Sequence, residues 1–559
     1  MVGRTADRVG ALVVALVAAL VAAPPIRDTD WGWHVAQGER VLAERALPWD
    51  DVWMWSSDGV RAVPYAWGFD VLIALADRVG GVPGVAAFGM GLSALVGLAL
   101  HRALRWRGAA PLAAVGVAVT ILLAVRLRLI PRPHLVGDVF FLLTLSLLLD
   151  GARARSWRVW LLPPLMVLWA NLHPSALLGG GFLAVALVGE ALRRWRGKEG
   201  LVRADLVRYA LVLGACAVAC FLTPLGITQL DFLFLNRGWA EAALVTELRP
   251  LSWRAFHMDR VTILVAALVA LPALLRRLPL RDPAPWLVAA AAGVLAAKTS
   301  RFYVEWLLLT AFAAAPAYAA PAGRRARAVA RAALGLALGR VALDAAPELL
   351  TLDRPLLSPT MHCERTADFL ATTPVPGPVF NSQRLGGYLV YRLRGRPKLF
   401  WDGRLHFYPS FIAEGRFEVL QARFGFRTLV VAEREGQVPA ETEAGDAAWA
   451  CVHFDDEARV FVDARDPLAA RGLRFARFRW ERTAGGIERL LVPDLEHPAE
   501  AAAELETWAR QQPDGYYAHL ALGRARLALG DRAGARAAAA VADRKRSTAT
   551  SRALLAASR

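Results

Sequence analysis

Cysteine is scarce in this chain, with four in 559 residues, so a disulfide-rich scaffold is excluded. The sequence also has no evident glycine-rich loop of the kind that cradles nucleotide phosphates. Its two halves show no convincing similarity, which disfavours a transporter built from internal repeats. Apolar sequence is abundant instead: 56% of the residues are hydrophobic, and the mean hydropathy is +0.36.

Long apolar runs dominate the chain up to about residue 345. Runs of about 18–25 residues match the thickness of a bilayer, so a soluble enzyme, a disordered chain and a fibrous protein are excluded. The 67–79 stretch is too short to cross and is interpreted as an interfacial or re-entrant helix. The first run could be a signal peptide, but an uncleaved helix is favoured because further spans follow. We expect about eleven transmembrane helices, at residues 9–26, 83–101, 109–125, 134–149, 159–172, 174–192, 207–223, 260–275, 284–298, 302–320 and 328–345.

Charge predicts the orientation of these helices. The chain carries 66 Lys+Arg against 49 Asp+Glu, and the predicted inner segments are more than twice as dense in basic residues as the outer ones. The positive-inside rule therefore places the N-terminus in the cytoplasm and residues 346–559 outside. A basic excess often indicates nucleic-acid binding, but most of this charge lies in the membrane half. In short inner loops such as residues 193–196, topological anchoring and contact with anionic headgroups explain it better, so we expect no nucleic-acid partner.

Four regions are expected: a membrane domain at 1–345, an extracytoplasmic α/β domain at 346–495, a helical segment at 496–545 and a flexible tail at 546–559. Residues 427–431 read as a strand, and residues 449–463 read as a hairpin. The helical segment resembles a tetratricopeptide unit. It either caps the α/β domain, which is favoured, or binds a protein partner. Cys363 and Cys451 either pair in an oxidising compartment or remain thiols.

The first outer loop begins with two closely spaced carboxylates, Asp28 and Asp30, directly beyond a span. Such a pair can bind a divalent cation such as Mg or Mn, or one member can act as a general base. An ordinary solvated loop or a helix cap is the alternative. Trp33 and His34 follow, and the tryptophan also suits an interfacial aromatic belt.

The other outer ends bring further polar groups to the same membrane face. Arginine is the preferred phosphate-binding side chain, and ionisable groups at membrane depth are usually functional or paired. A face that combines carboxylates, histidines and arginines suits a lipid-linked phosphate that leaves while a carboxylate activates a hydroxyl. Asp28 or Asp30 would be the base. We assign phosphate binding to Arg126, Arg128, Arg132, His134, Lys298 and Arg301, and supporting or acceptor roles to Trp33, His34, Asn171, His173 and Glu247.

Several short motifs share this outer face or the exterior domain. They read Asp28-x-Asp30-Trp-x-Trp33-His34, Arg132-Pro133-His134, Trp169-Ala-Asn171-Leu-His173, and Gly386-Gly387-Tyr388 followed by Asp402-Gly403-Arg404. Together, over about residues 10–465, the chain resembles the GT-C superfamily of polytopic glycosyltransferases that use polyprenyl-phosphate sugars. The resemblance implies that Asp28 and Asp30 form the catalytic or metal-binding site. Gly32 replaces a tryptophan of the usual motif, and protein N-glycosylation is not supported.

We therefore expect an α-helical polytopic membrane glycosyltransferase with an exterior α/β domain and a tetratricopeptide-like tail. It would lie in a bacterial inner membrane, contact membrane lipids and transfer a sugar from a polyprenyl-phosphate donor to a periplasmic lipid, glycan or protein. A non-catalytic scaffold and, less favoured, a transporter are the alternatives. Asp402 and Arg404 are expected either to shape a turn or to bind the acceptor.

Overall fold

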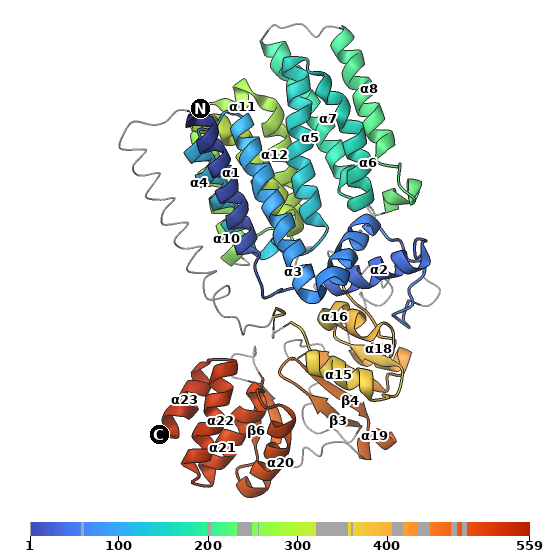
Figure 1. Cartoon of the computed structure of the whole chain (residues 1–559), viewed down its shortest axis with the longest axis vertical. Helices are drawn as coiled ribbons and strands as arrows, with labels where there is room; N and C mark the ends of the chain where they lie inside the picture. Colours follow the sequence, from blue (N-terminus) through green and yellow to red (C-terminus); the bar gives the residue numbers. More distant parts are fainter. Residues whose placement is uncertain are drawn as a thin grey trace. The chain divides into compact units, whose positions relative to one another are not determined.

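The computed structural model of the chain is mostly helical, with a small mixed sheet in its C-terminal part (Figure 1). Its contacts divide the chain into two units. Unit 1 comprises Met1–Trp49 and Ala62–Leu357, and unit 2 comprises Asp50–Arg61 and Ser358–Arg559. The structure describes residues 2–57, 61–197, 203–231, 249–254, 257–319, 356–358, 361–404, 417–432, 448–470, 478–482 and 489–559.

The described part of unit 1 consists of helices and short 3₁₀ turns. Ten of the predicted spans fall on these helices, and the one at 328–345 lies outside the described residues. The main helices are α1 (Val2–Val21), α2 (Trp31–Glu44), α3 (Trp67–Trp106), α4 (Pro111–Ala124), α5 (His134–Ala154), α6 (Leu162–Leu172), α7 (Ala176–Arg196), α8 (Arg203–Ala219), α10 (His257–Leu275), α11 (Leu278–Arg281), α12 (Pro283–Lys298) and α13 (Tyr303–Ala314). The 3₁₀ turns are η1 (Arg126–Arg128), η2 (Trp157–Leu161), η3 (Gly226–Leu230), η6 (Ser300–Phe302) and η7 (Ala315–Tyr318).

Four described helices are long and apolar enough to cross a membrane, namely α3, α5, α7 and the Met258–Leu275 part of α10. Three shorter apolar helices accompany them, at Pro111–Ala124, Val207–Ala219 and Pro283–Lys298. These helices support a membrane protein, whereas the count of eleven spans stays a prediction.

Helix α3 joins the short apolar stretch at 67–79 to the predicted span at 83–101. The two parts meet at a kink, where Gly81 has a φ of 59° and a ψ of −147°. Only glycine adopts that backbone conformation readily, and Pro83 then removes one helical hydrogen-bond donor. The 67–79 stretch is thus helical and is set off from the predicted span by the kink, whereas its interfacial or re-entrant placement stays a prediction.

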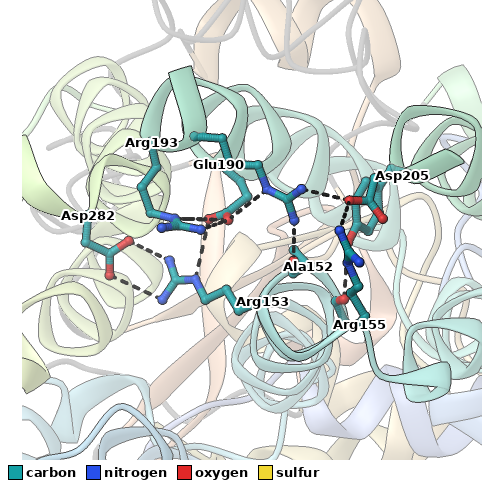
Figure 2. A network of polar contacts seen from close by, with 10 residues as sticks. Ala152, Arg153, Arg155, Glu190, Arg193, Asp205 and Asp282 are labelled. Atoms are coloured by element: carbon teal, nitrogen blue, oxygen red, sulfur yellow. Dashed lines mark hydrogen bonds and ion pairs between the residues drawn. The ribbon is translucent and has the colours of Figure 1, made fainter. Parts of the chain in front are cut away.

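Ion pairs join the helices of unit 1 at one end (Figure 2). The carboxylate of Glu190 on α7, only 2% exposed, accepts hydrogen bonds from Arg193, and Arg153 of α5 lies beside it. Arg153 also reaches Asp282, 2.5 Å away, between α11 and α12. The arginines near residue 193 were predicted to anchor topology and contact headgroups, but Arg193 and Arg194 pair with acidic side chains of the protein.

The sheet of unit 2 contains β1 (Val379–Asn381), β2 (Thr428–Ala432), β4 (Ala458–Asp463) and β3 (Trp449–Phe454), in that order. Strands β1 and β2 are parallel, and the remaining pairs are antiparallel. The predicted strand at 427–431 and the predicted hairpin are both present, as β2 and as β3 with β4. Helices α15 (Glu364–Thr372), α16 (Gln383–Leu393), α18 (Phe417–Phe424) and α19 (Pro467–Ala470) and the separate pair β5 (Phe478–Arg482) and β6 (Arg489–Pro493) complete this region.

The chain ends in four helices, α20 (Pro498–Gln511), α21 (Tyr516–Ala528), α22 (Arg532–Lys545) and α23 (Ala549–Ala557). They pack on the β3–β4 hairpin, because the Phe454 ring lies 4.1 Å from that of Trp508, and Asp456 accepts the backbone N–H of Tyr516. Burial raises the pKa of Asp456, although these backbone hydrogen bonds oppose the rise. The likeness to a tetratricopeptide unit stays a prediction.

Residues 546–559 differ from the flexible tail that was expected. They contain α23, whose first turn is closed by reciprocal hydrogen bonds between Thr548 and Ser551. Leu554 of this helix is 6% exposed and belongs to the apolar cluster of the other terminal helices. A capped start and a buried leucine therefore order this segment.

All four cysteines are buried free thiols. Cys363 and Cys451 are not joined by a disulfide, so both remain thiols, which was one of the two states expected for them. Burial raises the pKa of Cys451 to about 12 and that of Cys363 also well above its usual value. Neither thiol is therefore ionised at neutral pH.

Candidate active site

The carboxylates of Asp28 and Asp30 meet one arginine. Asp28 and Asp30 lie between α1 and α2, and Asp28 is 5% exposed. The guanidinium of Arg132 donates from Nε to Asp28 Oδ2 over 2.7 Å and from Nη2 to the other oxygen of that carboxylate. The same Nη2 lies 2.8 Å from Asp30 Oδ2. Arg132 thus binds Asp28 in the bidentate geometry that guanidinium and carboxylate groups favour. It also links two acids to a residue more than one hundred positions away in the sequence.

The backbone holds Arg132 in a short, stiff segment between η1 and α5. Prolines at 131 and 133 flank it and fix their own φ angles. The backbone N–H of Arg132 donates to the carbonyl of Ile130 over 2.7 Å, and its carbonyl accepts from Leu135. The prolines and these backbone hydrogen bonds therefore fix the position of the Arg132 backbone, from which its side chain reaches the two carboxylates.

His34 is oriented by a buried acid that the sequence analysis did not single out. Its Nδ1 lies 2.5 Å from Oδ1 of Asp70 on α3, and the two residues are 3% and 0% exposed. The Trp33 ring lies beside the imidazole, with ring centroids 3.6 Å apart and the ring planes tilted by 30°. This dyad packs α2 onto α3, one helical turn after Asp30.

A second group of ionisable side chains lies around the start of α5. His134 Nε2 is 2.8 Å from the carbonyl oxygen of Arg128. Arg128, Arg132 and His173 all interact electrostatically with His134, and Arg301 does so with His173. Five of the predicted polar residues therefore form one electrostatic neighbourhood.

Two acids missed by the sequence analysis share this neighbourhood. Asp138 on α5 is 1% exposed, and neither of its carboxylate oxygens has a hydrogen-bond partner among the described residues. Glu305 on α13 interacts with it electrostatically and also with Arg128 and Arg301. A signal existed for both, because each is an acid within a predicted span, and such residues are usually functional.

The other predicted site residues lie apart from this group or outside the described residues. Arg126 is exposed and donates to the carbonyl of Leu123, and Lys298 is exposed at the end of α12. Asn171 accepts from the Trp67 indole and donates to carbonyls of α6 and of the turn after α8, so it ties three helices together. Glu247 lies outside the described residues.

Asp402 and Arg404 lie in unit 2 and are 0% and 4% exposed. Arg404 binds Asp402 through Nε at 2.8 Å and binds Asp51 through Nη2 at 3.0 Å. Its guanidinium also lies over the Trp53 ring, 5.0 Å from the centroid. Burial raises the pKa of Asp402, and Arg404 opposes that rise. Among the described residues these groups hold residues 51–57 within unit 2, which favours the structural role of Asp402 and Arg404 over acceptor binding.

We call the contact between residues 51–57 and the rest of unit 2 the loop clamp, and we define it as Asp51, Trp53, Trp55, Asp402 and Arg404. Two residues of the neighbouring motifs, Asn381 and Gly386, support it. Asn381 accepts the backbone N–H of Phe400 and donates to the carbonyl of Trp401. A Cβ on Gly386 would lie 2.3 Å from that carbonyl oxygen, so only glycine fits there. Trp55 completes the clamp by donating to the carbonyl of Val379 and packing on the ring of Phe400.

A divalent cation does not fit between Asp28 and Asp30 as they are arranged. Three of the four carboxylate oxygens are bonded to the Arg132 guanidinium, and its fixed positive charge would repel a divalent ion held about 2.0–2.6 Å from the same carboxylates. Among the described residues a group with the spacing of metal ligands occurs elsewhere, at Asp494, Glu496 and His497 before α20. That group is largely exposed, and His497 already pairs with Asp494 over 3.0 Å.

No protein-family model and no curated protein matches the chain. Solved structures do. The archaeal oligosaccharyltransferase AglB from Archaeoglobus fulgidus, in complex with an inhibitory peptide and a dolichol-phosphate, matches with a TM-score of 0.56 and 11% identity over 96% of this chain and 86% of that one. The A. fulgidus enzyme tethered to an acceptor peptide with the NVT sequon matches with a TM-score of 0.53 and 11% identity, over 86% and 75%.

ArnT from Cupriavidus metallidurans in the apo state also matches, with a TM-score of 0.48 and 14% identity, over 82% of this chain and 98% of that one. Sequence identities this low concern the fold alone. The AglB match spans nearly the whole chain, including unit 2. The fold of this chain is therefore similar to that of the AglB oligosaccharyltransferase structures.

Proposed function

We propose that this protein is a membrane glycosyltransferase that moves a sugar from a polyprenyl-phosphate donor to an acceptor at the outer face of a bacterial inner membrane. The observation that carries the proposal is the convergence of Asp28 and Asp30 on Arg132, beside the polar group around His134. The GT-C fold supports the same reaction class, and the AglB structure of that fold contains a dolichol-phosphate. The acceptor is a lipid, a glycan or a protein.

The roles follow from charge and position. Arg128, Arg132 and Arg301 are the cations that would hold the donor phosphate. Arg128 and Arg301 could each present a pair of N–H groups, whereas Arg132 would contribute its charge and its Nη1, because the carboxylates engage its Nε and Nη2. As the sugar leaves, negative charge grows on that phosphate, and fixed cations lower the energy of the transition state. His173 and His134 belong to the same group of polar side chains and would add hydrogen bonds to the donor.

One carboxylate of the first loop is assigned as general base. An inverting transfer needs one base to take the proton of the acceptor hydroxyl, because the phosphate leaves as a stable anion. Asp28 is held by two bonds to Arg132 and Asp30 by one. The less engaged Asp30 is therefore the better proton acceptor, and Asp28 orients the arginine.

The test compares lipid-linked and cell-surface glycans in cells with the wild-type chain, without it, and with Asp28→Asn or Asp30→Asn at equal expression. We expect Asp30→Asn to abolish the glycan product and Asp28→Asn to reduce it at least tenfold. Asp368→Asn is the matched control, because that side chain is 63% exposed in unit 2. Unchanged glycans in both first-loop variants would refute the proposal.

A further inference from the structure

The arrangement around Arg132 places a permanent cation where a divalent metal would otherwise bind. Its Nε and Nη2 occupy both oxygens of Asp28 and one oxygen of Asp30. An ion that took the guanidinium's place on those oxygens would overlap its atoms, and an ion bound to their other lone pairs would lie beside a fixed positive charge that repels it. Arginine does not lose its proton in proteins, so the charge cannot be removed by deprotonation.

The surroundings of Arg132 also oppose its displacement. The segment is stiffened by the prolines on either side, and Pro131 lies against Gly89 of α3, where an added Cβ would come within 3.0 Å of the proline ring. The guanidinium is 22% exposed and the Asp28 carboxylate 7%, so water screens their contact only weakly. A metal ion would have to break a partly buried, bidentate ion pair before it could bind.

We propose that Arg132 is the resident cation of the Asp28–Asp30 pair, and that this pair takes up no divalent metal while Arg132 is present. The statement about metal binding does not depend on any activity. Its consequence for sugar transfer rests on the proposed function: the chain would work without a divalent cation, because the guanidinium supplies the positive charge.

The test measures Mn²⁺ binding to the purified full chain in detergent, by the loss of the free Mn²⁺ signal in electron paramagnetic resonance. The exposed group at residues 494–497 can give a background, so only binding that depends on Asp28 is counted. We expect the wild type and its Asp28→Asn variant to bind Mn²⁺ equally. Arg132→Met should gain one site, at least about tenfold tighter than the background, and Arg132→Met with Asp28→Asn should lose it.

Arg126→Met is the matched control, since it removes an exposed arginine six residues away and should gain no site. Mn²⁺ should raise the unfolding temperature of the Arg132→Met variant by more than that of the wild type, and a cooperative transition also shows that the variant is folded. Wild-type Mn²⁺ binding that Asp28→Asn removes would overturn the proposal. So would an Arg132→Met variant that is folded but gains no site.

Glycan formation is measured separately, in membranes treated with EDTA. Wild-type product that survives EDTA supports the consequence for transfer, and product that EDTA abolishes and Mn²⁺ restores contradicts it. If the chain makes no glycan at all, the proposed function fails while the Mn²⁺ titration still decides the identity of the cation. The two failures are therefore distinguishable.

Discussion

The loop clamp offers the sharpest test of the structure, through replacement of Arg404 by methionine. The guanidinium is almost completely buried and is the cation shared by Asp402 and Asp51. Methionine keeps much of the apolar volume and removes the charge. The variant would leave two buried carboxylates without their counterion, and it would also lose the contact with the Trp53 ring.

The expected cost follows from these contacts. Removing one partner of a buried ion pair destabilises a protein by about 3–5 kcal/mol, because the remaining charge stays desolvated. Asp51→Asn should cost less, about 1–2 kcal/mol, since Arg404 keeps Asp402 and only one charged contact is weakened. For a domain of this size, about 2–4 °C are lost per kcal/mol, so Arg404→Met should lower the unfolding temperature by about 6–20 °C.

The assay is calorimetry of the full chain in detergent, with the unfolding of unit 2 identified by limited proteolysis at the same temperatures. Arg465→Met is the matched control, because Arg465 makes a 2.6 Å ion pair with Asp463 but is 90% exposed. Such exposed pairs contribute about 0–1 kcal/mol. If Arg404→Met unfolds within 1–2 °C of that control, the clamp does not stabilise unit 2 and the reasoning is refuted.

Three further predictions concern single side chains. Burial would raise the pKa of Asp282, but Arg107 and Arg153 outweigh burial and hold it below its usual value. Asp282→Asn should therefore destabilise the chain at pH 7 by about 1–3 kcal/mol, and unfolding curves of the two proteins should converge as the pH falls below about 3.8. Asp138→Leu should raise the unfolding temperature, since a buried carboxyl without a partner among the described residues costs about 1–3 kcal/mol, while glycan formation falls; lowered stability would contradict this. Gly386→Ala should lower the free energy of unfolding by about 1–3 kcal/mol, because the added Cβ would collide with a backbone carbonyl oxygen. An unchanged melting curve would show that the backbone there can move aside without cost, which contradicts the prediction.

Local and short-range features were predictable from the sequence. Apolar length located the helices, and alternation located β2 and the hairpin of β3 and β4, because both signals depend only on neighbouring residues. The grouping of Arg132 with Asp28 followed from topology, since loops on one membrane face meet there. The helix α23 was missed because a polar stretch hid its cap and its one buried leucine.

Contacts between distant segments were beyond sequence reasoning. The pairing of Arg404 with Asp51 joins residues 353 positions apart, and no local sequence pattern around either residue predicts the other as its partner. The contact of His34 with Asp70 was missed because the two residues lie on different helices. In addition, an acid in the first turn of a helix is expected there for its interaction with the helix dipole, so Asp70 did not stand out. Asp138 and Glu305 were within reach, since a carboxylate inside an apolar run is itself unusual.

The assignment of residues 50–61 to unit 2 restricts how many times the chain between the two parts of this unit can cross the membrane. A segment that packs within unit 2 must share one side of the membrane with residues 358–559, although hundreds of residues separate them. The intervening chain must therefore cross the bilayer an even number of times, whatever the true number of spans. This parity is independent of the distribution of lysine and arginine. It also means that residues 50–61 must wait for their partners during synthesis, because residues 358–559 are made only after the last intervening membrane crossing.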